Sequence, residues 1–383
     1  MKIAVLGFGT VGAGIHEMLQ KAEGLEPGPV WVRRGKADEA WKTDDFDRIL
    51  ADPSIDAVAE AIGGTDPAYG LAKRTLESGR HFVTANKMLV AEYGLELQKI
   101  ADRSGAAFLF SAACGGGVPL LHNLALARRG DEIVSVKGIL NGTTNYMLDR
   151  MQTEGLGYEE ALKQAQALGY AEADPSADVS GLDALRKIRL ASAVAFGILP
   201  DGCLHEGIEN VSAEDIRFYQ SKGLVLRLIA KAARTEEGVS AHVEPVLFAR
   251  NAAEAAVSLN NNLAVYEGRF CGRIGLSGQG AGRYPTASAV IRDLESILSG
   301  ARRMLPEKTV RAAADNGSEK YRCYLRLTEA FAGLFPGAER LEQSTADGSL
   351  RLLTKPLPAD RMHAAAAEIR KKGGCISFAA LEE

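Results

Sequence analysis

The sequence lacks the features that mark several large classes of protein. Its five cysteines lie far apart and form no CxxC pair, which excludes the common zinc motifs and a secreted disulfide framework. Lys and Arg number 45 against 49 Asp and Glu, so there is no basic surplus to bind nucleic acid or an anionic membrane. The longest apolar stretch, ASAVAFGILP at 191–200, is about half as long as a membrane span. We therefore expect a cytoplasmic protein whose partners are small molecules, and neither nucleic acid nor a membrane.

Internal repeats and low-complexity tracts are absent as well, and the sequence shows instead the alternation of a globular α/β protein. Short apolar segments alternate with helical segments from residue 1 to about residue 122. This pattern is typical of a Rossmann-type doubly wound parallel sheet. The predicted strands cover residues 2–7, 29–34, 56–64, 81–87 and 106–112.

The glycines of GFGTVG follow the first predicted strand and begin a helix. Gly7 permits a tight turn, Gly9 lets the backbone approach a pyrophosphate, and Gly12 lets the helix pack on the strand. The N-terminus of the helix then offers N–H groups to the phosphates. This context predicts a dinucleotide-binding turn.

The end of the second predicted strand decides which dinucleotide binds. An acidic residue there binds the ribose 2′-hydroxyl of NAD, whereas an arginine suits the 2′-phosphate of NADP. Arg33 and Arg34 stand at this position, so NADP is favoured. The alternative is that both arginines are solvated and that Asp38 serves the ribose of NAD.

Asp183 and Lys187 lie one helical turn apart and border the apolar face of a predicted helix. A plain surface ion pair would add only a few tenths of a kcal/mol, so a buried pair needs another reason. The predicted strand 81–87 brings Lys87 to the carboxyl edge of the sheet, where ligands of doubly wound folds bind. The alternative for Lys87 is a lysine that merely ends a strand.

Two further segments suit the close approach of a ligand. FSAACGGGVPLL at 110–121 contains three consecutive glycines, which let the backbone come near a bound molecule. NGTT at 141–144 is expected to end a strand in a turn whose amides and hydroxyls bind a small carboxylate. A plain hairpin or a helix cap is the alternative for NGTT.

Together these segments resemble the homoserine dehydrogenase family, from Met1 to about Ile297. GFGTVG, VTANKMLVA, NGTTNYML, GYAEADPSADVSGLDALRK and GAGRYPTASAVIRDL occur in the order and spacing of that family. The resemblance implies reversible NAD(P)-dependent interconversion of L-homoserine and L-aspartate 4-semialdehyde, on the pathway to threonine and methionine. It also implies a homodimer or homotetramer.

The resemblance assigns roles to individual residues. Lys187 and Lys87 match the lysines of proton transfer, with Asp183 beside Lys187, and such a base must lie within hydrogen-bond reach of the reacting hydroxyl. Glu172 is expected to hold the ammonium group of the substrate. The other expected contacts are Gly142, Thr143, Tyr170 and Asp178 for the substrate, and Gly7, Gly9, Thr10, Val11, Gly12, Arg33, Arg34, Gly63, Lys87, Gly282 and Thr286 for the cofactor.

The glycine-rich segment departs from the family's pattern at Ser111, where many members carry an acidic residue. In the family, backbone carbonyls of this segment bind a monovalent cation, Na⁺ or K⁺. The corresponding carbonyls here belong to Cys114 and Gly116, and the loss of the carboxylate weakens that expectation. A second role for Cys114, as the nucleophile of an acyl-enzyme dehydrogenase, would leave Lys87 and Lys187 unexplained.

A chain of 383 residues is too long for one ordinary hydrophobic core, so we expect several domains. We expect an NAD(P)-binding Rossmann domain at 1–122 and 282–316, because Pro285 near a helix start marks a return of the chain. An α+β substrate and dimerisation domain is expected at 123–281. A small βαββαβ domain at 320–383 resembles, in degenerate form, the amino-acid-binding ACT module of the family.

The role of this C-terminal domain stays open. Its first helix is too short, and EAFAGLF replaces the expected turn after its first strand. Threonine as an effector, and a plain role in dimerisation or packing, are the two alternatives. A hypothesis of another class, a non-catalytic sensor of NADP or an amino acid, conflicts with the intact set of lysines and carboxylates.

Overall fold

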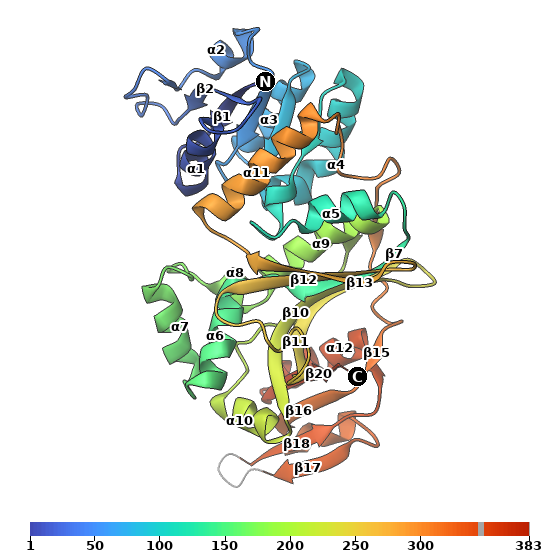
Figure 1. Cartoon of the computed structure of the whole chain (residues 1–383). Coiled ribbons are helices and arrows are strands. Elements are labelled where there is room, and N and C mark those ends of the chain that lie inside the picture. The colour runs from blue at the N-terminus through green and yellow to red at the C-terminus, as the bar shows by residue number, and fades with distance from the viewer. Residues whose placement is uncertain (344–347, 383) are drawn as a thin grey trace. The chain divides into compact units, whose positions relative to one another are not determined.

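The computed structural model describes residues 1–343 and 348–382, and the chain divides into two compact units (Figure 1). The first unit comprises Met1–Ile133, Arg189–Leu199 and Tyr266–Val310. The second unit comprises Val134–Ile188, Pro200–Val265 and Arg311–Glu383. Among the described residues, no helix combines the length and the hydropathy that crossing a membrane requires.

The first unit is built on a six-stranded parallel sheet with the order β3-β2-β1-β4-β5-β6. This is the Rossmann order, in which the direction of winding reverses between β1 and β4. The predicted doubly wound sheet is therefore confirmed. The strands are β1 (Lys2–Leu6), β2 (Glu26–Trp31), β3 (Lys42–Thr43), β4 (Ala57–Glu60), β5 (His81–Thr84) and β6 (Phe108–Leu109).

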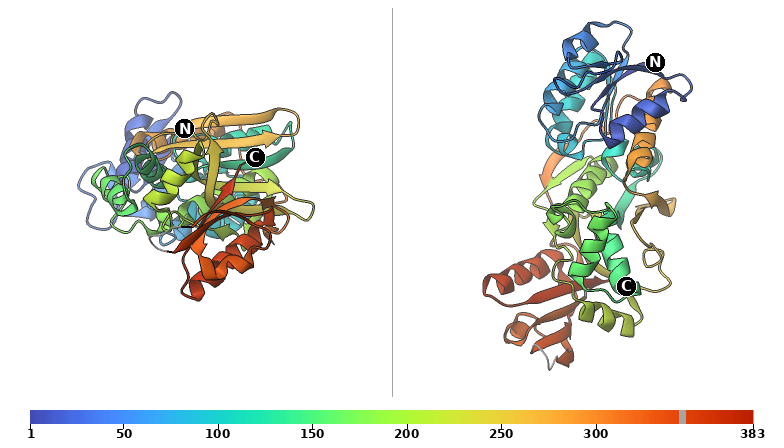
Figure 2. Two further views of the ribbon diagram at one scale, coloured as in Figure 1. Left: turned by 90° about the horizontal axis from the view of Figure 1, so that it is seen from below. Right: turned by 90° about the vertical axis from the view of Figure 1, so that its left-hand side faces the viewer.

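Helices cover the sheet of the first unit, which explains why its central strands are uniformly apolar. The side chains of β1 from Ile3 to Leu6 are fully buried, as a parallel sheet covered on both faces requires. Helices α1 (Thr10–Leu19) and α11 (Arg283–Leu298) lie side by side, so the C-terminal part of this unit returns to its beginning (Figures 1 and 2). The remaining elements are α2 (Phe46–Ala51), α3 (Ala68–Glu77), α4 (Lys87–Ser104), the 3₁₀ helix η1 (Ser111–Ala113), α5 (Leu120–Ala127) and β13 (Gly272–Gln279).

All five predicted strands were too long at their carboxyl ends. The strand predicted at 56–64 ends at Glu60, because the Glu60 carboxylate accepts hydrogen bonds from the next turn in place of a strand partner. The strand predicted at 81–87 ends at Thr84, because Asn86 caps a helix that begins at Lys87. The other three end at Leu6, at Trp31 (before Arg33 and Arg34) and at Leu109 (before Ser111).

The second unit contains a mixed sheet in which β12, β7, β10, β11, β20, β16, β18 and β17 lie in that order. Its longest pair joins β10 and β11, which run antiparallel from Leu224↔Ala249 to Arg234↔Val239. The elements that belong to this unit wholly or in part are β7 (Ile133–Ile139), α6 (Gly142–Thr153), α7 (Tyr158–Ala167), α8 (Ser176–Val179), α9 (Leu182–Phe196), β8 (Ile198–Asp201), β9 (Leu204–His205), α10 (Ala213–Ser221), β10 (Leu224–Arg234), β11 (Val239–Ala249), β12 (Asn261–Gly268) and β14 (Val310–Ala313). From Arg189 on, α9 belongs to the first unit.

The C-terminal segment extends this sheet through β20, which pairs parallel to β11. Its strands follow the antiparallel order β20-β16-β18-β17, and α12 covers one face of them (Figure 2). The elements are β15 (Lys320–Tyr321), β16 (Cys323–Thr328), the 3₁₀ helix η2 (Glu329–Leu334), β17 (Glu339–Gln343), β18 (Ser349–Leu353), β19 (Leu357–Pro358), α12 (Ala359–Lys371) and β20 (Ile376–Leu381). Residues 344–347 and 383 of the predicted domain lie outside the described residues.

Candidate active site

The three glycines of the first turn are needed for three different reasons. Gly7 has φ of 95°, in the left-handed region, and a Cβ there would lie 2.9 Å from the Ala61 oxygen. A Cβ on Gly12 would lie 2.0 Å from the Gly7 oxygen, so α1 packs directly on the turn. A Cβ on Gly9 would meet nothing within 4 Å, so the space above it is open. Gly9 precedes Thr10, the first residue of α1, which leaves the N–H groups of that helix end available to a phosphate.

A second turn beside the first contains Gly63 and is held by Glu60. One carboxylate oxygen of Glu60 accepts from the Ile62 N–H (2.6 Å) and the Gly63 N–H (3.1 Å), and the other accepts from Thr84 (2.5 Å). Burial raises the pKa of Glu60. Sequence reasoning missed this residue, although a glutamate inside an otherwise apolar strand was a signal that it has a specific partner.

Arg33 and Arg34 lie in an exposed turn after β2, which fits both the predicted contact with a 2′-phosphate and the alternative of two solvated arginines. Asp38, the alternative partner of the ribose, is engaged with Lys42 at 2.7 Å, and this hydrogen bond lowers the pKa of Asp38. Trp41 packs between two residues near the glycine turn, with its ring 5.0 Å from Phe8 and 4.5 Å from His16.

Lys87 begins α4, next to the turn that contains Gly63. The side chain of Asn86 accepts from the Leu89 N–H (3.1 Å) and donates to the Gly64 oxygen (2.5 Å). The cap residue of α4 therefore ties the start of that helix to the carboxyl edge of the sheet, and Lys87 is the next residue along the chain.

The glycine-rich segment 115–117 lies against the segment that leads into α11. A Cβ on Gly116 would lie 2.5 Å from the Gly280 oxygen, and the Gly117 N–H donates to the Gln279 oxygen (3.0 Å). Gly282 has φ of 121° and precedes α11, where the Thr286 N–H donates to its oxygen (3.1 Å). In this part of the chain, the backbone of residues 115–117 therefore packs directly on the backbone of residues 279–282.

Ser111 is paired with a buried carboxylate that the sequence did not single out. Asp293 of α11 accepts from the Ser111 N–H (2.7 Å) and from its hydroxyl (2.6 Å). Burial raises the pKa of Asp293 to about 7. Cys114, three residues further on, is fully buried, which does not suit a nucleophile that must meet a substrate.

In the second unit, Asp183 and Lys187 form a largely buried ion pair. Lys187 Nζ lies 2.7 Å from Asp183 Oδ2, and the two side chains are 12% and 7% exposed. Lys187 Nζ also donates to the Leu140 oxygen (2.6 Å). The lysine is therefore held from two sides, by its own helix and by the end of β7.

Asn141 connects this pair to a second carboxylate. Its side-chain amide donates to Asp178 Oδ1 (2.7 Å) and Asp183 Oδ2 (2.9 Å), while its oxygen accepts from the Thr144 N–H (2.9 Å). Burial raises the pKa of Asp178, and the charge of Asp183 adds to the effect, although the hydrogen bond from Asn141 opposes it. Asn141 therefore holds the buried Asp183 and the half-buried Asp178, two acids that would otherwise repel each other.

Sequence reasoning missed Asn141 and misread the segment that follows it. Gly142, Thr143 and Thr144 form the first turn of α6, with Asn141 as the N-cap. The structure supports the helix-cap alternative for NGTT, while the binding of a small carboxylate by its amides and hydroxyls stays a prediction. The signal was present, because asparagine before a Gly-Thr-Thr sequence is a favourable N-cap.

The remaining predicted substrate residues are only partly brought together. Thr143 donates to the Tyr170 oxygen (2.5 Å) and to Asp178 Oδ2 (3.3 Å), which joins three of them. The Tyr170 ring is 38% exposed. Glu172 is exposed, and its carboxylate makes no hydrogen bond within the described part of the chain.

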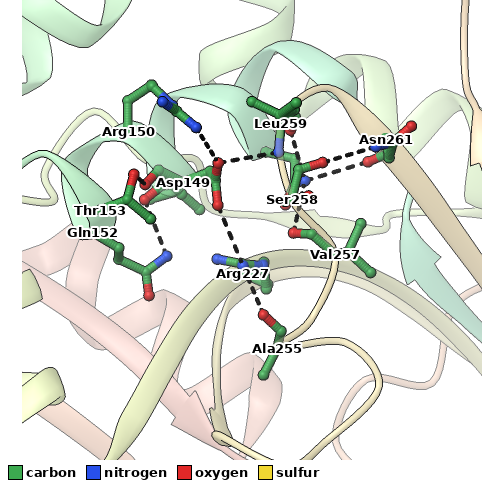
Figure 3. Close-up of polar contacts among 12 residues, drawn as sticks. Asp149, Arg150, Gln152, Thr153, Arg227, Ala255, Val257, Ser258, Leu259 and Asn261 are labelled. Carbon is green, nitrogen blue, oxygen red and sulfur yellow. Dashed lines mark hydrogen bonds and ion pairs between the residues drawn. The ribbon is translucent and has the colours of Figure 1, made fainter.

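A buried polar network holds the loop before β12 against α6, and Figure 3 shows its part around Asp149. Asn145 donates to the oxygens of Val257 (3.2 Å), Leu259 (2.9 Å) and Asn261 (3.3 Å). Asp149 accepts from the Leu259 N–H (3.1 Å).

Two further contacts complete this support. Arg227 donates to the Ala255 oxygen (2.9 Å) and lies 4.0 Å from Asp149. A Cβ on Gly142 would lie 2.7 Å from the Asn260 oxygen, so the loop presses directly on the predicted substrate-binding turn. No residue of this supporting network was predicted from the sequence.

Comparison with known proteins identifies the family of this chain. A family model described as homoserine dehydrogenase matches residues 119–294, and one described as its NAD binding domain matches residues 7–111. A homoserine dehydrogenase from Synechocystis sp. is 40% identical over 317 residues, covering 78% of this chain and 73% of the relative. The chain belongs to the homoserine dehydrogenase family.

Solved structures of homoserine dehydrogenases agree with this assignment. The enzyme from Thiobacillus denitrificans has a TM-score of 0.87 at 31% identity and covers 100% of this chain and 98% of its own. A hyperthermophilic archaeal homoserine dehydrogenase in complex with NADPH has a TM-score of 0.68 at 25% identity, covering 79% of this chain and 98% of its own. The chain is thus an NAD(P)-dependent oxidoreductase that interconverts L-homoserine and L-aspartate 4-semialdehyde, as its motifs predicted.

Proposed function

We propose that Lys187 moves the proton in this reaction and that Asp183 orients it. Oxidation of homoserine sends a hydride from carbon to the nicotinamide and a proton from the hydroxyl to a base, here the neutral amine of Lys187. In the reverse direction the ammonium form returns the proton to the aldehyde oxygen. The observation that carries this proposal is the largely buried 2.7 Å pair of Lys187 and Asp183.

Lys87 polarises the reacting oxygen or relays the proton. Its place at the first turn of α4, after β5, supports this role, because ligands of Rossmann folds bind at the carboxyl ends of the strands. The test is the turnover of Lys87→Ala and Lys187→Ala across a range of pH. Near-wild-type turnover with unchanged pH profiles in both variants would contradict the assignment.

The substrate is bound by the residues around Asn141. The exposed carboxylate of Glu172 suits a substrate ammonium group, because it has no hydrogen bond to give up within the described chain. Gly142, Thr143, Tyr170 and Asp178 line the same region, and Asn141 joins them as the residue that sets the position of the carboxylates of Asp178 and Asp183.

The cofactor is NADP, with NAD as the alternative. Gly9 has open space where a side chain would stand, and the exposed Arg33 and Arg34 suit a 2′-phosphate. Asp38, which NAD would need, is already engaged by Lys42. Thr10, Val11, Gly63, Lys87, Gly282 and Thr286 are the further cofactor contacts.

Initial rates with NADPH and with NADH test the cofactor proposal, each with and without threonine. NADPH is expected to give the higher kcat/KM, and Arg33→Asp should reduce that preference. An enzyme that prefers NADH, and keeps that preference in Arg33→Asp, would contradict the proposal.

A monovalent cation, Na⁺ or K⁺, fits the backbone around Cys114 and Gly116. A Cβ on Gly116 would lie 2.5 Å from the Gly280 oxygen, so backbone and not side chains surrounds this segment, and the groups it offers an ion are carbonyls. Such an ion would fix the glycine-rich segment in place. Asp293, hydrogen-bonded to Ser111, supplies a carboxylate near the position where many relatives carry an acid.

Residues 320–383 form an ACT-like domain in degenerate form. The strand order β20-β16-β18-β17 supports this, and η2 in place of the first helix is the degenerate feature. Threonine as an effector and a plain packing role remain the two alternatives that the rates with threonine distinguish.

We propose three domains, at 1–122 with 282–316, at 123–281 and at 320–383. We also propose that the protein is a homodimer or homotetramer and that it is cytoplasmic. Light scattering of the purified protein measures the oligomeric state directly. A monomer at working concentrations would overturn that part.

A further inference from the structure

Five arginines line one cavity of about 910 Å³ in the first unit. The walls come from α5, from the C-terminal half of α11 and from residues 299–307. The cavity lies at the opposite end of α11 from Gly282 and Thr286, so it is separate from the glycine-rich turn that serves the dinucleotide. We call it the arginine cavity, and its arginines are Arg128, Arg129, Arg292, Arg302 and Arg303.

Two of these arginines form hydrogen bonds or an ion pair with neighbouring residues, which accounts for their presence. Arg302 donates to the oxygens of Ile297 (3.2 Å) and Ala301 (3.0 Å) at the end of α11, where a cation is favourable. Arg303 donates to the Leu305 oxygen (3.1 Å) and lies 3.5 Å from Asp102.

The other three are not explained in this way. Arg292 Nη1 and Arg128 Nε are buried and have no hydrogen-bond partner in the described chain. Arg128 makes one side-chain contact, to the Met304 oxygen at 3.3 Å, and Arg129 makes none with any described residue. Buried guanidinium donors are normally satisfied, so unpartnered ones that line a cavity point to a missing acceptor.

The charges around Arg128 lead to the same conclusion. Burial lowers the pKa of Arg128, and the charges of Arg129 and Arg303 lower it further, with no carboxylate acting in the opposite direction. A cluster of like charges in a half-buried cavity is unfavourable unless a counter-charge joins it.

The acids in the lining supply only part of that counter-charge. The charge of Arg292 acts on Asp293, but both oxygens of Asp293 already accept from Ser111. Glu307 lies 3.9 Å from Arg303, although its side chain is 87% exposed. Glu295 is the third acid of the lining, against five arginines. The cavity therefore keeps a positive excess.

From this cluster we propose that the arginine cavity binds a phosphorylated small molecule. Guanidinium groups recognise phosphate oxygens through paired N–H donors, which matches the unpartnered buried donors of Arg128 and Arg292, with the exposed Arg129 beside them in the lining. Leu109, Leu126 and Met304 add an apolar wall for the organic part of the ligand. The volume is within the range of ordinary ligand sites. This proposal does not depend on the proposed proton transfer, and the arginine cavity needs no role in catalysis.

Titration calorimetry with pyrophosphate as the probe tests the proposal, with NADPH saturating so that the dinucleotide turn is blocked. Wild-type protein is expected to bind pyrophosphate saturably, more tightly than orthophosphate, whereas chloride at matched ionic strength gives no saturable heat. Arg128→Ala and Arg292→Ala should each weaken binding about tenfold or more. Arg129→Ala, nearer the surface, provides a third variant if one of these fails to fold.

Arg269→Ala is the matched control, because Arg269 belongs to the same unit, is 62% exposed and lies outside the cavity. It should bind pyrophosphate like the wild type. Absence of saturable binding to the wild type would overturn the proposal. Equal binding by the wild type and all three cavity variants would also overturn it. A change of oligomeric state in those variants would overturn it too, because the arginines would then belong to a contact between copies of the chain.

Discussion

The glycine-rich turn of the first unit and the carboxylate–lysine cluster of the second unit are built in opposite ways. The turn works because side chains are missing, since a Cβ on Gly7 or Gly12 would collide with backbone oxygens. The cluster works because charged side chains are present and buried, with Asn141 donating to two acids and Lys187 pairing with one of them. An added atom should therefore break the turn, and a removed hydrogen bond should break the cluster.

The largest effect is expected from the loss of the lysine. Lys187→Met removes the proposed proton carrier, so turnover should fall by about 10²–10⁴-fold, the usual contribution of general acid–base catalysis. Lys163→Met, at an exposed lysine of α7 in the same unit, is the matched control and should keep wild-type turnover. Steady-state rates with NADPH and aspartate semialdehyde measure both variants. An equal loss of turnover in the two would show that Lys187 has no special role.

Two glycine variants separate folding from cofactor binding in the turn. The Cβ of Gly12→Ala would lie 2.0 Å from the Gly7 oxygen, so we expect a drop in Tm together with weak NADPH binding. Gly9→Ala meets no protein atom within 4 Å and should keep the wild-type Tm while binding NADPH more weakly. Thermal melts and NADPH fluorescence titration check the pair. A Gly12→Ala protein as stable as Gly9→Ala would show that the close packing is not required.

Asp293 offers a buried acid in the first unit for comparison with the cluster. Its pKa is raised from 3.8 to about 7 by burial, so the unfolded chain loses this proton at lower pH than the folded chain. The contribution of Asp293 to stability is therefore full below about pH 4 and falls by about 4 kcal/mol as pH rises to about 7. Asp293→Asn should remove this fall, measured by urea unfolding at several pH values. Asp47→Asn, at an exposed carboxylate, should keep it, and a wild-type stability that is constant from pH 4 to 7 would rule the effect out.

Asn141→Ala should destabilise the second unit by about 1–3 kcal/mol, because the buried Asp183 and the half-buried Asp178 lose a shared donor. Asn141→Asp should be worse, since it adds a third negative charge at the same place. The exposed Asn251→Ala is the control. Urea unfolding measures all three, and an Asn141→Ala protein as stable as the control would mean that the acids do not need the donor.

The smallest effect is expected at Cys114. This thiol is fully buried, and the proposed chemistry uses no cysteine, so Cys114→Ala should keep the wild-type kcat/KM. A loss of turnover with an unchanged Tm would revive the acyl-enzyme alternative.

The two sites also differ in how much of them could be predicted from sequence. The turn of Gly7, Gly9 and Gly12 is local, so its spacing after an apolar strand was enough to predict it. The four-residue spacing of Asp183 and Lys187 was equally readable. Asn141 was missed because it meets Asp183 across 42 residues of chain, and nothing in a single sequence indicates that contact.

The ends of strands were the least predictable part of the fold. β4 and β5 stop where Glu60 and Asn86 take backbone hydrogen bonds with their side chains, and these bonds depend on tertiary neighbours such as Thr84 and Gly64. Hydrophobic alternation carries no information about such caps. The doubly wound parallel sheet itself, by contrast, could be predicted from the alternation of strand and helix.

The most direct test of the central claim is the pH profile of kcat/KM for homoserine oxidation in three proteins: wild type, Asp183→Asn and Lys187→Met. The account predicts that activity of the wild type rises with pH as the lysine becomes a neutral base. The rise should shift to lower pH in Asp183→Asn, which no longer holds a carboxylate 2.7 Å from Lys187 Nζ, and should vanish in Lys187→Met. A Lys187→Met protein with the rate and pH profile of the wild type would contradict the account.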